Sequence, residues 1–126
     1  MLEKLSTELI ENILDHLPVE IDFADVDDIF RYYNHSDNRI LKRTPTAIGK
    51  KVQDCHPQKS VPKVQQMLDD FKSGQRDVAE FWINLHGRLI YIRYFAVRDK
   101  ENKYQGVLEV TQDITDIKGI EGEKRR

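Results

Sequence analysis

The chain has little of what several classes of protein require. A single cysteine, Cys55, among 126 residues excludes a disulfide framework and suits a reducing cytoplasm. Mean hydropathy is −0.64, and no apolar run approaches the roughly 20 residues that a membrane-spanning helix needs. Its 20 basic and 22 acidic residues give a net charge of −2, which leaves no basic field for nucleic acid or an anionic membrane. We therefore expect a cytoplasmic protein with no nucleic-acid or membrane partner.

Sequence signatures of catalysis and of metal binding are also missing. The chain has no nucleophile-elbow motif, no phosphate-binding loop and no Gly-x-Gly-x-x-Gly pattern. His16, His35 and His86 show no spacing to one another or to Cys55 that would build a metal site. We predict a protein that is not an enzyme and that holds no metal.

What the chain does contain is enough for one domain with one core. A helix is predicted from the N-cap Ser6 to Pro18, and a second one from Lys59 to Lys72 with Ser60 as a cap and Gly74 as its end. The strand patterns fall at residues 19–24, 29–33, 78–85, 89–98 and 104–114. This order predicts an α+β domain with a five-stranded antiparallel sheet, helices on one face and an N-terminal amphipathic helix.

Apolar side chains occur at both odd- and even-numbered positions of the strands at 78–85 and 89–98. Because alternate residues of a strand face opposite sides of a sheet, both faces of this hairpin are apolar. One face covers the core beneath the Lys59–Lys72 helix, and the other needs a second cover. The N-terminal helix supplies an apolar stripe that either folds back on its own sheet or docks on a neighbouring subunit. We expect a homodimer, with interface residues Leu9, Ile10, Ile13, Leu14, Leu17, Trp82, Tyr91 and Phe95.

Several segments between residues 17 and 115 resemble those of a PAS domain, a sensory module of bacterial signalling proteins. Leu17–Asp25 resembles the first PAS strand with its turn aspartate, and Ile29–Asn34 is similar to the second strand. Tyr94–Asp99 resembles the fourth strand, and Asp113-Ile-Thr115 resembles the sequence with which the last strand ends. The resemblance implies an N-terminal helix over 1–18, a PAS core over 19–117 and the start of a C-terminal linker helix over 118–126.

A narrower resemblance comes from Gly49–Pro57, Glu80–Ile83 and Arg93–Arg98. These segments are most similar to the C-terminal PAS domain of bacterial and archaeal proteins that also carry a hemerythrin-type HHE domain. The resemblance implies that the chain is part of a larger polypeptide whose other domains are its partners.

Cofactor-binding subclasses of the family can be compared residue by residue. The flavin-binding subclass has a cysteine motif shortly after the glycine that corresponds to Gly49, but here Cys55 lies three residues too late. The strand positions whose polar side chains would contact flavin are the apolar Ile90 and Leu108. Haem binding needs a histidine on the long helix, which has none; His56 precedes it. We expect neither flavin nor haem. His56 as a haem ligand, or Cys55 as a redox thiol beside an imidazole, stays an alternative to a purely structural role.

The resemblance also places a set of nearly all apolar side chains on the inward side of the fold, where they would suit a small apolar ligand or fill the core. This predicted pocket consists of Val64, Met67, Leu68, Phe71, Ile90, Ile92, Tyr94, Leu108 and Val110. The predicted function is a non-catalytic sensory module that relays ligand or partner binding through the sheet and the terminal helices. The alternative is a ligand-free assembly module that dimerises its parent protein.

Overall fold

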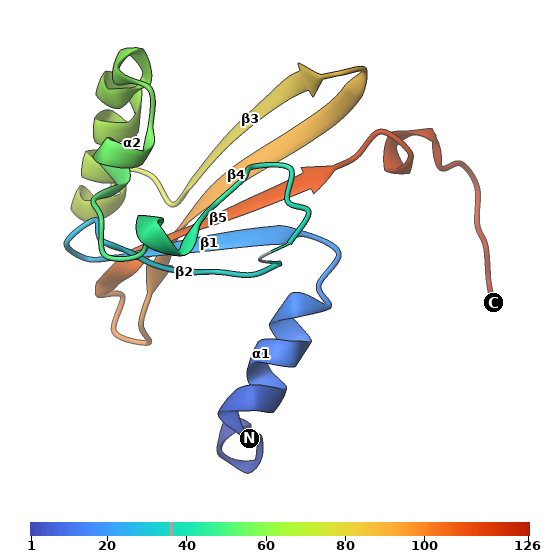
Figure 1. Ribbon diagram of the computed structural model, residues 1–126, viewed down its shortest axis with the longest axis horizontal. Coiled ribbons are helices and arrows are strands. Elements are labelled where there is room, and N and C mark those ends of the chain that lie inside the picture. Colours follow the sequence, from blue (N-terminus) through green and yellow to red (C-terminus); the bar gives the residue numbers. More distant parts are fainter. Residues whose placement is uncertain (36) are drawn as a thin grey trace.

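Five strands form one antiparallel sheet in the computed structural model, which describes residues 1–35 and 37–126. The strands are β1 (Glu20–Asp25), β2 (Phe30–Tyr33), β3 (Val78–Leu85), β4 (Arg88–Arg98) and β5 (Tyr104–Asp113), in the spatial order β2-β1-β5-β4-β3. Two α-helices, α1 (Thr7–Asp15) and α2 (Val61–Ser73), and short 3-10 turns between β2 and α2 complete the fold (Figure 1). The predicted α+β class and the five strands are confirmed.

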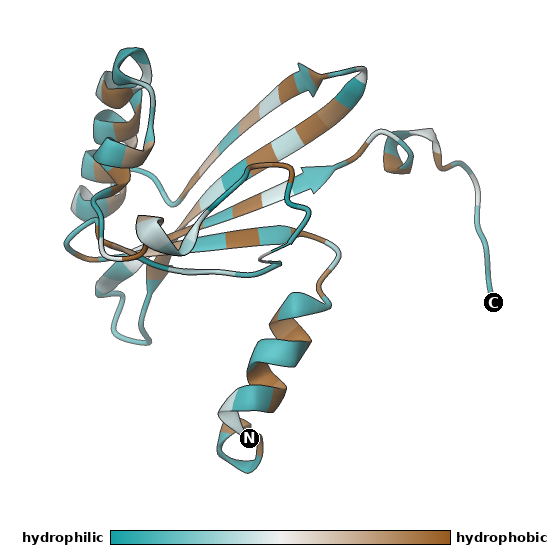
Figure 2. Cartoon of the chain, viewed as in Figure 1, coloured by the Kyte–Doolittle hydropathy of each residue, from teal (hydrophilic) through white to brown (hydrophobic). Residues whose placement is uncertain are grey.

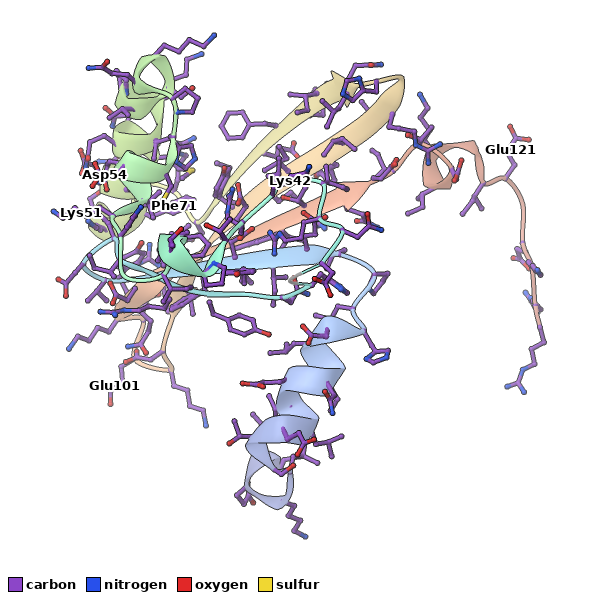
Figure 3. The ribbon with its side chains drawn as sticks, viewed as in Figure 1. Lys42, Lys51, Asp54, Phe71, Glu101 and Glu121 are labelled. Atoms are coloured by element: carbon purple, nitrogen blue, oxygen red, sulfur yellow. The ribbon has the colours of Figure 1, made fainter. Side chains whose placement is uncertain are left out.

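Helix α2 packs on one face of the sheet, which we call the inner face, and builds the core there. Its buried Met67, Leu68 and Phe71 contact small residues of the strands, among them Ala24 and Val107. Small side chains on the sheet let the helix approach closely, and each large apolar side chain buried this way contributes roughly 1.5–3 kcal/mol. Phe71 lies at the end of α2 nearest β1 and β2 (Figure 3). The core therefore occupies one end of the inner face.

The ends of the two helices follow the sequence signals with one exception. Ser6 caps α1, since its Oγ accepts the Leu9 N–H at 3.0 Å, and Gly74 ends α2 in the left-handed conformation at φ +84°. Ser60 occupies the N-cap position of α2 as predicted, but its side chain makes no capping hydrogen bond. Ser60 has helical backbone angles because it closes a 3-10 turn, Gln58–Ser60, that leads directly into the helix.

Helix α1 stands away from the sheet rather than lying on it (Figure 1). The stripe of apolar side chains along it is visible as brown bands in Figure 2, and Leu9 and Ile13 are 44% and 48% exposed. The buried Asn34 holds the end of this helix, because its Nδ2 donates to the Leu14 and Val19 carbonyls at 2.8 and 3.1 Å. Folding back on its own sheet, one of the two expected covers, is therefore wrong for this chain. The opposite, outer face of the sheet stays uncovered by α1.

The C-terminal segment also differs from its prediction. After β5 the chain forms a single 3-10 turn, Ile117–Gly119, and residues 120–126 have no regular structure, so the helix expected over 118–126 is not formed. Two glycines, Gly119 and Gly122, disfavour a helix in this short segment. Ile117 and Ile120 are exposed, and no packed apolar face compensates for that cost.

Gly106 of β5 gives a direct test of how closely β1 and β5 pack. A Cβ at this position would lie 2.2 Å from the Ala24 carbonyl oxygen and 2.7 Å from the Phe23 ring, and φ is +149°. We expect Gly106→Ala to lower the free energy of unfolding by about 3 kcal/mol or more. Gly119→Ala, where a Cβ meets nothing within 4 Å, should leave it within about 0.5 kcal/mol in the same urea titration. Equal stabilities of the two variants would contradict this.

Candidate functional site

Three polar side chains lie side by side on the inner face, across the central strands. Asp22 of β1 pairs with Glu109 of β5, and Glu109 pairs in turn with Tyr94 of β4. Directly paired residues in an antiparallel sheet project to the same side. The middle of the inner face, beyond the end that α2 covers, is therefore acidic.

This register corrects part of the predicted pocket. Leu108 and Val110 pair with Phe95 and Arg93 on the outer face, and the inward positions of β5 are Val107, Glu109 and Thr111. A shift of one residue exchanges the two faces of a strand. The inward positions of β5 carry the more polar side chains, so the usual alternation of apolar and polar residues points to the wrong face of this strand.

The other residues of the predicted pocket are on the inner side. Met67, Leu68, Phe71 and Ile90 are buried. Val64, Met67, Ile92 and Tyr94 line an open groove of about 290 Å³ between α2 and the β3–β4 hairpin. Phe81 and Ile83 complete the strand side of this groove and are 45% and 43% exposed although they lie on the inner face. The groove is the apolar part of the site, and the acidic row is its polar part.

Two arginines from the segment after β2 neutralise the acidic row. The Nη2 of Arg39 donates to both carboxylate oxygens of Asp22, at 2.9 and 2.8 Å. Arg43 contacts Asp22 at 3.2 Å and Glu109 at 3.3 Å. Glu20 is also buried, and its carboxylate accepts the backbone N–H groups of Ile40 and Leu41. These contacts hold residues 39–43 over the sheet, and Lys42 lies in front of β4 and β5 in Figure 3.

A small cavity of about 30 Å³ lies beneath Arg43. Its polar lining comes from Asp22, Glu109, Tyr94 and Arg43, and its apolar lining includes the Phe30 ring, 5.6 Å from the Arg43 guanidinium carbon. The remaining lining residues are Phe23, Ala24, Val52, Cys55, His56 and Val107. The cavity thus joins the acidic row to the edge of the hydrophobic core.

Burial and like charge change the acidity of this row. Burial is the main cause that raises the pKa of Asp22 from 3.8 to about 7, and the neighbouring Glu109 charge is the second; Arg43 and Arg39 oppose both. Burial, followed by the Glu109 charge and a hydrogen bond to it, also raises the pKa of Tyr94. The Tyr94 hydroxyl therefore stays a proton donor toward the carboxylates.

Cys55 and His56 both line the cavity. Their adjacent positions in the sequence did not by themselves show that both side chains face the same space. The His56 Nδ1–H donates to the Val52 carbonyl at 2.9 Å, which fixes the ring. Cys55 is a free thiol and is half-buried. Among the residues described by the structure, no group of three or more histidine, cysteine, aspartate or glutamate side chains could hold a metal. Within that same part of the chain, no helix is long and apolar enough to cross a membrane.

The fold and a central pocket between sheet and helix define the class of protein, and comparison with known families agrees. The model of the PAS domain family matches residues 10–115, so the chain belongs to that family. None of the curated proteins matches it. The C-terminal domain of a Streptococcus mutans protein is 42% identical, with a TM-score of 0.87 over 93% of this chain and 91% of that one.

More distant solved structures share the fold alone. A sensory box sensor histidine kinase from Vibrio cholerae is 14% identical, with a TM-score of 0.60 over 90% of this chain and 94% of that one. VqmA bound to DPO is 22% identical, with a TM-score of 0.61 over 89% of this chain and 59% of that one. The chain is thus a PAS domain with the fold found in sensor kinases and VqmA.

The raised pKa of Asp22 predicts an unusual pH dependence. Between about pH 4 and pH 7 the folded state binds more protons than the unfolded state, so stability falls as pH rises through this window. We expect the free energy of unfolding, measured with urea, to fall by about 2 kcal/mol from pH 5 to pH 8. Asp22→Asn should remove this decrease, and Glu101→Gln in an exposed turn should keep it. A wild-type slope in Asp22→Asn would contradict the assignment.

Proposed function

We propose that this PAS domain is a non-catalytic sensory module in which occupation of the cavity beneath Arg43 changes how the chain leaves the sheet. The observation that carries this proposal is that one strand, β5, reaches both places. Val107 and Glu109 line the cavity, and Asp113 at the end of the same strand holds the C-terminal exit. A displacement of Val107 and Glu109 is transmitted along the hydrogen-bonded strand to Asp113.

The segment that follows β5, residues 114–119, is called the exit segment, and polar contacts hold it against the start of β4. Arg88 at the start of β4 pairs with Asp113 at 2.7 Å and with Asp116 at 3.2 Å. The Thr115 hydroxyl accepts the Leu89 N–H at 2.8 Å and donates to Asp113 at 2.6 Å. The hydrogen bond from Arg88, followed by those from Thr115, lowers the pKa of Asp113 to about 2. These contacts are partly exposed to solvent and therefore weak, which suits a relay.

Relay here means a shift between two populations of the exit segment. A ligand favours one population only by binding it more tightly than the other. In the longer parent polypeptide that the sequence resemblance implies, the exit segment would pass this shift to the next domain. We infer that this parent also carries a hemerythrin-type domain, on the basis of the segments over 49–57, 80–83 and 93–98.

A cavity-filling substitution tests the relay without knowledge of the ligand. Val107→Ile adds one methylene toward the cavity, and Val110→Ile makes the same change on the outer face of the same strand. We expect Val107→Ile to change the hydrogen-exchange rates of amides 114–119 by at least ~3-fold. Val110→Ile should leave them unchanged. Equal rates at the exit in both variants and the wild type would contradict the relay. Native mass spectrometry of the purified protein then identifies any molecule that occupies the site.

The second candidate, an assembly module, is favoured by the outer face of the sheet. Strands β1 and β5 turn acids inward and aliphatic or aromatic residues, such as Phe23 and Leu108, outward. On β3, Trp82 is 63% exposed on that same side. An exposed apolar face of this kind marks a contact surface, and a VqmA structure is described as a dimer. We propose a homodimer in which this face and the exposed stripe of α1 are covered by the second copy.

Trp82→Glu tests this interface at its most exposed aromatic side chain. We expect the dimer dissociation constant to rise by at least ~30-fold, because aromatic anchors dominate such contacts. Val26→Glu, which changes an equally apolar and 45% exposed residue in the β1–β2 turn, should leave the dimer intact. The measurement is size-exclusion chromatography with light scattering across protein concentrations. A wild-type monomer at all concentrations would remove the assembly function, and a ligand-free dimer would favour it over sensing.

A third candidate uses the two remaining cavity residues. Cys55 and His56 line the same space, which is the position required of a redox-active thiol or of an axial ligand. A Soret absorption band of the purified protein would support haem, and a low thiol pKa would support the redox reaction. An inert thiol and a protein without visible absorption would exclude both.

A further inference from the structure

We infer that Arg43 is an internal ligand of the cavity, and that a small organic cation with a guanidinium or primary ammonium group binds in its place. This inference rests on the proposed function, because it names the class of molecule that the sensory cavity accepts.

The two arginines of the site differ in how firmly they are held. The Arg39 side chain is 1% exposed, and besides its two hydrogen bonds to Asp22 it donates to the Asn34 and Leu41 carbonyls. Arg43 is 17% exposed, and each of its two carboxylate contacts is single and longer than 3.1 Å. Its third contact is to the carbonyl of its own neighbour, Lys42, at 3.2 Å. Arg39 is therefore a fixed part of the fold, and Arg43 is the group that can leave.

Charge decides what can replace Arg43. Three buried carboxylates, of Glu20, Asp22 and Glu109, face two guanidinium groups. Removal of Arg43 leaves those carboxylates with Arg39 alone, so the vacated place has excess negative charge even when Asp22 carries a proton. A buried, unpaired carboxylate is costly. The replacement must bring a positive charge and N–H donors, and an anionic ligand would increase the imbalance.

The surroundings of the Arg43 guanidinium fit such a cation and limit its size. The Phe30 ring lies 5.6 Å from the guanidinium carbon, a distance at which an aromatic face stabilises a cation. The adjoining cavity of about 30 Å³ is lined on its far side by apolar groups, among them Ala24 and Val107. A space of that volume holds roughly one water molecule or one methyl group. A guanidinium or ammonium group with one or two carbon atoms therefore fills the place of Arg43 together with the cavity.

The exchange has a structural consequence as well. Between Leu41, held by Glu20, and the 3-10 turn Pro45–Ala47, the backbone of residues 42–44 has no regular structure. Once the Arg43 side chain is displaced, this segment loses its contact with the inner face. A cation in the cavity thus changes both the strand below it and the surface segment above it.

Titration of methylguanidinium into the full chain tests the inference, with methylurea as the neutral probe of the same shape and acetate as the anionic one. Binding is followed by NMR chemical shifts at constant ionic strength. We expect Arg43→Met to bind methylguanidinium at least ~10-fold more tightly than the wild type, because an internal competitor that occupies the site reduces apparent affinity by its occupancy. Methylurea and acetate should bind neither form.

Matched variants separate displacement from a general charge effect. Arg31→Met removes an exposed arginine that pairs with Asp25 at 2.6 Å and should leave the wild-type affinity unchanged. Glu109→Gln combined with Arg43→Met should abolish the gain. Arg43→Lys keeps the charge with a single-point head group, and we expect an intermediate affinity; if Arg43→Met does not fold, this variant carries the comparison. Weaker binding in Arg43→Met or Arg43→Lys than in the wild type would overturn the inference, as would preferential binding of acetate.

The outcomes also distinguish this inference from the proposed function. If none of the forms binds methylguanidinium while Val107→Ile still alters exchange at the exit, the ligand class is wrong and the relay stands. If methylguanidinium binds as expected while Val107→Ile leaves the exit unchanged, the cavity is a cation site that does not signal through β5.

Discussion

Two carboxylates that face each other across the central strands are the constraint on which the rest of the site depends. Asp22 and Glu109 are both buried and directly paired, and like charges at this distance in a poorly solvated place repel unless cations or a proton intervene. Arg39 and Arg43 supply the cations. The segment that carries them must therefore lie on the inner face, where it covers the middle of the sheet.

This division of the inner face explains why the cavity lies where it does. Helix α2 packs against small strand residues at one end, and the arginine segment is drawn to the acids in the middle. Neither cover fills the space where they meet, and Phe30, Val52 and Tyr94 surround it. A cavity between an apolar and a charged cover combines shape with charge, and a ligand site needs both.

The outer face has the opposite character, and this connects the two candidate functions. Because the acids of β1 and β5 are turned inward, the aliphatic residues that alternate with them are turned outward. A pattern that would suit the core in an ordinary sheet lies instead on the face that α1 leaves uncovered. The two proposed functions, sensing on the inner face and assembly on the outer face, therefore involve opposite sides of the same strands.

Much of the fold could be predicted from the sequence because its signals are local. The Ser6 cap, the glycine that ends α2 and the apolar and aromatic runs of β3 and β4 depend on neighbours within a few residues. The PAS resemblance was carried by segments in the right order, and Tyr94 was predicted to point inward. The start of a linker helix over 118–126 was predicted from the resemblance and is not formed, since so short a helical segment needs packing that it does not have.

The polar half of the site could not be predicted in the same way. Arg39 and Arg43 lie far along the chain from Glu109, and only the tertiary structure brings their charges together. In β5 the inward Glu109 and Thr111 are polar while the outward Leu108 and Val110 are apolar, so pairing with β1 and β4, and not composition, decided which of them point inward. The sequence by itself determined the elements and their order, because these follow from local backbone preferences. Strand register and charge pairing decided the chemistry of the pocket, because both depend on contacts between residues that are distant in the chain.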